Sequence, residues 1–482
     1  MKKEKYRCEI NNPRILLYGP EIAGHYAYLS IGFKRLGIRC DLATTDHKTF
    51  QYGGDRISIN IQEKFIIYIN KIFLGSRMKR FLLNTFEKAT SPILVKKIFN
   101  FLSLLFVALK YDCIFFCFGK SFYTNSKLEF YIYRLFGVRT IFTFHGSDAR
   151  PKYINAVYYP PSILHHINWK EMANEVKTQK TRLKLIEKYA DLILAAPAGT
   201  HFLTRKVINI SLLGNPLGIN IESSSLKSAL MRLSAPLSIE YSQDQIVRIL
   251  HCPSAPESKG SFVIKQIIEN LKLKGLPIKY YEFTGVTNDI IIEAIKNCDL
   301  VIDSLWNDSP GGTFPSEAGY FGKPVIIGGY FKEISDHLYS KDIMPPYIYV
   351  HPDDFEDTVI KYVLDKKLRI ESGRNLQKFI MQHRNIESIA ENYYNLIVGK
   401  IPKEFWLKPK EIKYTFGYGA SETHIKKLIR GLVQHCGLDA LQLNNRPTLK
   451  DAFVKFAQLE NFNDEVDMIR GQDARATMNQ DI

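Results

Sequence analysis

The sequence lacks the features by which disulfide frameworks, zinc sites and membrane spans are recognised. Its seven cysteines form no C-x-x-C pair, and several lie in apolar, strand-like runs such as 111–117. We therefore expect buried thiols in a reducing compartment and no metal site. The basic segment 1–7 is not followed by an apolar core, and the longest apolar run, 99–109, is too short to cross a bilayer. These absences predict a cytoplasmic protein.

Nucleotide-binding fingerprints are also missing. The first strand-like run, 14–19, ends in the loop 19–24, which opens a helix at His25. This loop has neither the G-x-G-x-x-G spacing nor the lysine of a P-loop. We interpret Gly19 and Gly24 as residues that border a cleft, and a plain strand-to-helix turn is the alternative.

Composition is typical of a globular protein with an anionic ligand. The 482 residues are 45% hydrophobic and 24% charged, with a formal net charge of +16. A basic balance favours phosphate-bearing ligands, anionic membranes or nucleic acid. The basic residues are scattered and no nucleic-acid reader motif is present, so we expect no nucleic-acid partner. A basic protein without any such partner remains the alternative.

Strand-like and helix-like segments alternate in two blocks, which predicts an α/β protein with two tandem doubly wound domains. A stretch without clear periodicity separates the blocks, and the sequence beyond residue 401 changes to Lys-rich, helix-like segments with a polar end. We therefore divide the chain into a first domain (1–213), a connection (214–245), a second domain (246–400) and a helical or partly disordered tail (401–482).

The segment 309–325 carries most of the chemical information. Gly311 and Gly312 precede a helix that contains Glu317 and ends at Gly322. A turn without side chains at the start of a helix presents backbone N–H groups to an anion. A carboxylate one turn further can accept hydrogen bonds from sugar hydroxyls. Together these parts suit a diphosphate attached to a ribose, and a glycine turn required for tight packing is the alternative.

Other polar residues follow predicted strands, where ligands of doubly wound domains bind. His145 and Asp148 lie on a glycine turn and can contact a polar ligand, although Asp148 could instead cap the backbone while His145 packs. Lys259 precedes a glycine where a helix begins, so it can neutralise a leaving group. The turn at Gly285 can hold a flat base against the backbone.

In order, the segments 144–148, 251–260, 298–303 and 311–325 resemble the GT-B glycosyltransferases and, among them, glycosyltransferase family 4. The resemblance covers roughly residues 14–400. It implies two Rossmann-like domains that face each other across a cleft, with the acceptor on the first domain and a nucleotide-sugar donor on the second.

The resemblance also implies residue roles. Lys259 would bind the diphosphate, Glu317 the ribose, and His145 would lie near the transferred sugar. We thus assign catalytic roles to His145, Lys259 and Glu317, donor binding to Ser254, Gly285, Val286, Ser309, Gly311, Gly312 and Thr313, and acceptor or cleft positions to Gly19, Gly24 and Asp148. Two departures stand out: Ser309 replaces the first of two family glutamates, and His251 is the nearest substitute for an arginine that usually precedes the lysine.

The expected activity is transfer of a hexose, with retention and without a metal or cofactor, to a glycan or lipid-linked acceptor of a bacterial-type surface polysaccharide. The basic, apolar segments 78–83 and 96–102 suggest peripheral contact with the inner face of the plasma membrane. Two alternatives stay open: a nucleotide-sugar epimerase on the same scaffold, and a catalytically silent nucleotide-binding module, which the serine at 309 favours.

Overall fold

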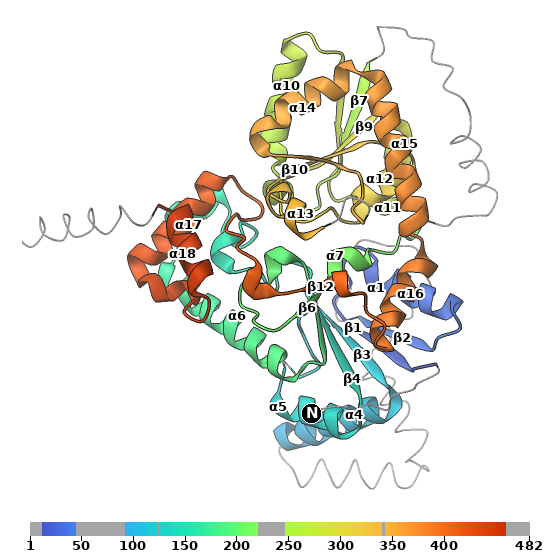
Figure 1. Cartoon of the computed structure of the whole chain (residues 1–482), viewed down its shortest axis with the longest axis vertical. Helices are drawn as coiled ribbons and strands as arrows, with labels where there is room; N and C mark the ends of the chain where they lie inside the picture. Colours follow the sequence, from blue (N-terminus) through green and yellow to red (C-terminus); the bar gives the residue numbers. More distant parts are fainter. Residues whose placement is uncertain (1–11, 45–91, 124, 220–245, 340–342, 459–482) are drawn as a thin grey trace, which may run out of the picture.

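The computed structural model describes residues 12–44, 92–123, 125–219, 246–339 and 343–458, and in this part of the chain two separate sheets form the centres of two α/β domains (Figure 1). The predicted membrane-contact segment 78–83, most of the connection (220–245) and the end of the tail (459–482) lie outside the described residues. No helix of the described part is both long and apolar enough to traverse a bilayer.

The first sheet has the strand order β12-β6-β5-β4-β3-β1-β2, and every neighbouring pair is parallel except β12 with β6. Its strands are β1 (Ile15–Gly19), β2 (Cys40–Thr44), β3 (Cys113–Cys117), β4 (Arg139–Thr143), β5 (Leu192–Ala195), β6 (Val207–Asn209) and β12 (Trp406–Leu407). Their apolar runs are buried on both faces, as a parallel sheet between helical layers requires.

Alternation along the strands divides the first core in two. Phe115 of β3 points to the layer of α1 (His25–Arg35), whereas Phe116 points to the opposite layer. That opposite layer consists of α4 (Pro92–Lys110), α5 (Lys127–Leu135) and α6 (Trp169–Tyr189).

The second sheet has the order β11-β10-β9-β7-β8 and is parallel throughout. Its strands are β7 (Val247–His251), β8 (Ile278–Glu282), β9 (Leu300–Asn307), β10 (Val325–Gly329) and β11 (Ile348–Val350). One face is covered by α10 (Ser261–Leu273) and α14 (Phe355–Leu364), the other by α11 (Asn288–Asn297), α12 (Thr313–Tyr320) and α15 (Lys366–His383). Shorter helices are α7 (Ile210–Leu213), α9 (Pro256–Lys259) and α13 (Lys332–Leu338). The predicted fold class, two doubly wound domains, is therefore confirmed.

The chain returns to the first domain after α15. The helix α16 (Ile386–Ile397), predicted within the second-domain range, packs on α1 and places Tyr393 in the first core. Next, β12 extends the first sheet, and α17 (Glu422–Cys436) packs on α6 (Figure 1). The predicted helical appendage is thus a folded part of the first domain, completed by α18 (Pro447–Phe456). Helical periodicity identified these segments, but it does not say which sheet a helix covers.

Candidate active site

The carboxyl ends of the two sheets face one cleft. In each sheet the strand order reverses beside the first strand, at β1 and at β7, and ligands of such sheets bind at this reversal. The loop after β1 and the turn before α12 meet there, because the Thr313 hydroxyl donates to the Ala23 carbonyl at 3.4 Å. The two domains therefore combine their ligand-binding edges into one site.

A cavity of about 210 Å³ lies at this meeting point. The first domain contributes the loops after β1 and β4, and the second contributes the segment 309–316 and the end of α15. The titratable side chains that line it are His25, His145, Tyr347 and Arg384, and none of the described lining residues carries a carboxylate. Elsewhere too, no described group of three or more His, Cys, Asp or Glu could hold a metal ion.

The glycine turn is shaped by its two different glycines. Gly311 has φ +95°, and a Cβ atom there would lie 2.9 Å from the Ile327 side chain, so this position requires glycine. Gly312 has φ −112°, and a Cβ atom would find open space. The backbone of α12 thus begins directly at the cavity, where unpaired helical N–H groups attract an anion.

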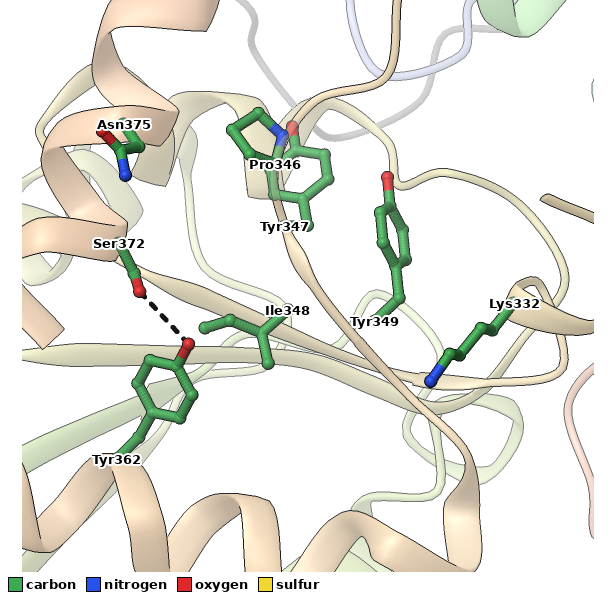
Figure 2. Close-up of a pocket in the computed structure, with 8 residues that line it drawn as sticks. All are labelled: Lys332, Pro346, Tyr347, Ile348, Tyr349, Tyr362, Ser372 and Asn375. Carbon is green, nitrogen blue, oxygen red and sulfur yellow. Dashed lines mark hydrogen bonds between the residues drawn. The ribbon is translucent and has the colours of Figure 1, made fainter. Parts of the chain in front are cut away.

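Two tyrosines, Tyr347 and Tyr349, form hydrogen bonds that brace the glycine turn. The Tyr347 hydroxyl is 2.9 Å from the Ser316 hydroxyl, which itself donates to the Gly312 carbonyl. The Tyr349 hydroxyl donates to the Pro310 carbonyl at 3.1 Å. Both tyrosines also line a second cavity of about 400 Å³ beside β11 (Figure 2). Tyr347 lines both cavities, so it forms part of the wall between them.

Arg384, which directly follows α15, is a site residue that the sequence analysis missed. It is 6% exposed, and it has no ion-pair partner among the described residues. A Cβ atom at Gly214 would lie 1.7 Å from its Nη1, so the guanidinium packs directly on that glycine. Burial lowers the pKa of Arg384, but a guanidinium stays charged at neutral pH. No local pattern distinguishes it from a cation that caps the end of a helix.

The opposite wall carries neutral imidazoles. Burial lowers the pKa of His145 to about 4. Burial, together with His145, lowers the pKa of His25 to about 3. The two rings meet edge to face with centroids 5.4 Å apart, and His25 Nε2 bonds the Tyr393 hydroxyl at 3.0 Å. The buried His145 Nε2 has no hydrogen-bond partner in the part of the chain that the structure describes, so it can bond a ligand hydroxyl.

Asp148 supports the histidine loop. Its Oδ1 accepts hydrogen bonds from the backbone N–H groups of His145 at 3.0 Å and Gly146 at 2.9 Å. Burial raises its pKa to about 6. Asp148 does not line the cleft cavity but borders another of about 740 Å³, together with Lys120 and Arg182. Of the two roles considered from sequence, backbone capping is the one observed.

Two predicted catalytic residues lie away from the cavity. Lys259 Nζ pairs with Asp303 on β9, 3.0 and 3.2 Å from its oxygens. Burial lowers the pKa of Lys259, but Asp303 and Tyr418 together more than offset this effect, so the pKa is raised overall. Glu317 points toward α11, where its Oε1 accepts from Asn288 at 3.2 Å, and burial raises its pKa to about 8.

The remaining predicted residues divide in the same way. Gly311, Gly312, Thr313 and Ser309 line the cavity, and the Ser309 N–H and hydroxyl both donate to Asn307. Outside it, Ser254 and Gly285 are exposed and Val286 is half-buried.

The two glycines of the first loop frame the site without lining it. A Cβ atom at Gly19 would lie 2.8 Å from the Cys117 Cβ, so this glycine serves close strand packing. Gly24 has φ 76° at the start of α1, and Ile22 and Ala23 between the two glycines line the cavity.

No protein-family profile and no curated protein sequence matches the chain. Among solved structures, it is similar to Anabaena Alr3699/HepE in complex with UDP, with 14% identity, TM-score 0.40, and coverage of 80% of this chain and 100% of that one. It is also similar to an alpha-glucosyltransferase in complex with UDP-glucose and DNA containing an abasic site, with 10% identity, TM-score 0.42, and coverage of 80% of this chain and 100% of that one. A third similar structure is the UDP-GlcNAc 2-epimerase from Neisseria meningitidis bound to UDP-GlcNAc, with 10% identity, TM-score 0.31, and coverage of 80% of this chain and 100% of that one.

Proposed function

We propose that the protein is a glycosyltransferase that uses a nucleoside-diphosphate sugar, of the GT-B type that family 4 represents. The observation that carries this proposal is the charge of the cleft cavity. One buried cation and one helix N-terminus face it, no described carboxylate lines it, and neutral imidazoles form the opposite wall. Such a site suits an anion on one side and sugar hydroxyls on the other.

In the proposed complex, the diphosphate lies against the Gly311–Gly312 turn and Arg384, while the sugar extends toward His145. The anomeric carbon–oxygen bond breaks and its electron pair remains on the diphosphate. The acceptor oxygen then bonds to the anomeric carbon from the same face, and its proton passes to the diphosphate. Positioned donors stabilise the leaving group, so the step uses neither a metal nor a free carboxylate. With its lowered pKa, His145 orients a hydroxyl and is a poor base.

The nucleoside would occupy the side of α12 that faces α11. Glu317 and Asn288 meet there, and Glu317 would exchange its bond to Asn288 for the ribose hydroxyls. Lys259 would then act indirectly, because its ammonium already binds Asp303. We retain the wider expectation of a retaining hexosyltransferase of surface-polysaccharide synthesis as part of this proposal.

The alternatives make different demands on the cleft. An epimerase needs an acid and a base on the sugar ring. In the described cavity, however, no carboxylate is available, and Asp148 caps the histidine loop. A silent nucleotide-binding module requires only the anion site, so it would bind the donor without turnover.

We further propose that the acceptor is presented at an anionic membrane. The helices α4 and α5 lie side by side at one end of the first domain (Figure 1). Large apolar side chains on them are exposed, and exposed Lys127 and Arg134 accompany these on α5. The apolar members of this α4–α5 patch are Phe101, Leu102, Leu109, Leu128, Tyr131 and Leu135. Mixed apolar and basic surface of this kind suits an interfacial site.

The deciding experiment is a thermal-shift panel of UDP, GDP, ADP and their sugars, with and without EDTA. A ligand at 100 times its dissociation constant stabilises by about 2.7 kcal/mol. Gly312→Ala should fold normally, because its Cβ has open space, yet the methyl group should weaken binding about tenfold. Absence of any nucleotide shift in the wild-type protein would refute the anion site, and binding without sugar transfer would favour the silent module.

A further inference from the structure

A buried ion pair joins the two domains beside the cleft. Arg150 donates from Nε and Nη2 to the two carboxylate oxygens of Asp308, both at 2.6 Å. The two residues are 158 positions apart, and their side chains are 6% and 1% exposed. A two-bond fork of this kind fixes orientation as well as distance.

The chain segment 412–420, which we call the strap, covers this pair. The ring of Tyr418 lies against the Arg150 guanidinium at 4.6 Å. The backbone of Tyr418 bonds Ile154 and Ala156 of the first domain, whereas the N–H of Gly419 donates to Trp306 of the second at 3.0 Å. The strap is therefore hydrogen-bonded to both domains.

The pair is also connected to both walls of the cavity. Asp308 directly precedes Ser309 and the glycine turn that begins α12. Arg150 lies two residues after Asp148, whose carboxylate holds the His145 loop. A rotation of one domain against the other must therefore break the fork. If the fork stays intact, the glycine turn and the His145 loop can only move together.

We propose that Arg150, Asp308 and Tyr418 form an interdomain clasp that sets the spacing between the glycine turn and His145, and that Arg150 and Asp308 are positioning residues for sugar transfer. This role in transfer rests on the function proposed above, whereas the clasp itself is a property of the fold. Removing the clasp should misplace the two walls, and a displacement of about 1 Å can cost about 100-fold in rate.

The test compares Asp308→Asn with Asp299→Asn. The control removes the same charge from a fork with the same two-bond geometry, since Arg248 bonds both oxygens of Asp299 at 2.9 and 3.1 Å. This control fork is more exposed, with side chains 41% and 25% accessible, and it lies within the second domain at the opposite end of its strands. If Asp308→Asn does not fold, Arg150→Met with Asp308→Leu replaces the fork by an apolar pair, a change that buried pairs often tolerate.

Two readouts separate the clasp from the proposed function. Spin labels at Leu135→Cys and Leu273→Cys, exposed positions on different domains, report the distance between the domains without any turnover. In Asp308→Asn this distribution should broaden, and kcat for transfer should fall about 100-fold while nucleoside-diphosphate affinity stays unchanged. In Asp299→Asn the distance distribution, kcat and the nucleoside-diphosphate affinity should all remain at the wild-type values. An unchanged distance distribution in Asp308→Asn, or equal broadening in the control, would overturn the clasp even if the wild-type protein transfers no sugar. A loss of kcat accompanied by an equal loss of nucleotide affinity would overturn the positioning role.

Discussion

The two domains are built on the same plan at one end of their sheets and differ at the other. Both place the first strand between the second and third, at β1 and at β7. In both, an arginine at the start of that strand forms a fork with an aspartate that precedes the neighbouring strand, Arg14 with Asp112 and Arg248 with Asp299. These forks join adjacent strand starts, far from the cleft.

The carboxyl ends show where the domains have diverged. The first domain presents His25 and His145, both neutral through burial. The second presents the glycine turn and the buried cation Arg384. One sheet order thus supports an uncharged wall and a cationic wall, because the loops, and not the strands, carry the chemistry.

The largest effect should come from the cationic wall. Arg384→Gln removes the only charge of the described cavity lining, and we expect kcat/KM to fall about 100- to 1000-fold, as for the loss of one positioned donor. Arg369→Gln is the matched control, since Arg369 is equally buried on α15 but bonds the carbonyls of Tyr362 and Val363. Equal losses in both variants would show that Arg384 acts through stability alone.

Lys259 should affect stability more than binding. Lys259→Met leaves the Asp303 carboxylate buried and unpaired with a cation, and breaking such a pair costs about 3 kcal/mol. The second substitution Asp303→Asn should restore much of the free energy of unfolding, measured by urea denaturation. If Lys259→Met instead weakens nucleotide binding without loss of stability, the lysine binds the diphosphate directly, as the family resemblance implies.

The stability contributions of Glu317 and His145 should respond to pH in opposite directions. Glu317 keeps a proton in the folded state that the unfolded chain releases above about pH 4.5, so its contribution to stability falls as pH rises toward about 8. His145 stays neutral when folded but charges when unfolded, so its contribution rises from about pH 4 to about pH 6.5. Each slope is at most about 1.4 kcal/mol per pH unit.

Denaturation of two variants between pH 5 and pH 8 measures these slopes separately. Relative to wild type, the free energy of unfolding of Glu317→Gln should increase as pH rises. In His145→Gln, the part of the wild-type increase that His145 causes below pH 6.5 should be absent. Parallel curves for the wild type and Glu317→Gln would mean that Glu317 is ionised in the folded protein.

The smallest effect concerns the α4–α5 patch. Leu128→Ser combined with Leu135→Ser should reduce flotation with anionic liposomes several-fold. Burying an apolar side chain fully contributes about 1.5–3 kcal/mol, and its contribution to membrane binding at an interface is smaller. Leu273→Ser, an exposed position on the second domain, is the control. Binding should also weaken at 1 M salt, where screening shortens to about 3 Å. No flotation of the wild-type protein at low salt would remove the membrane from the proposal.

The sequence by itself determined the two α/β domains, and it predicted two segments that line the cleft cavity. Alternating strand and helix periods depend on local residue patterns, so they predicted two α/β blocks and helical segments beyond residue 401. The glycine turn and the His145 loop were found because ligands bind where strands end, which is a rule of the fold class.

Tertiary structure decided the charges of the site. Whether a buried cation faces a cavity or pairs with a carboxylate depends on residues distant in sequence. Lys259 pairs with Asp303, and Arg150 pairs with Asp308. Arg384 instead packs on Gly214 and faces the cavity. The edge strand β12 and the packing of α16 on the first domain were undetectable for the same reason. A two-residue strand has no sequence pattern of its own, and an apolar helix face does not indicate which sheet it covers. Local patterns fix the elements, whereas electrostatics and burial arise only when separate segments meet.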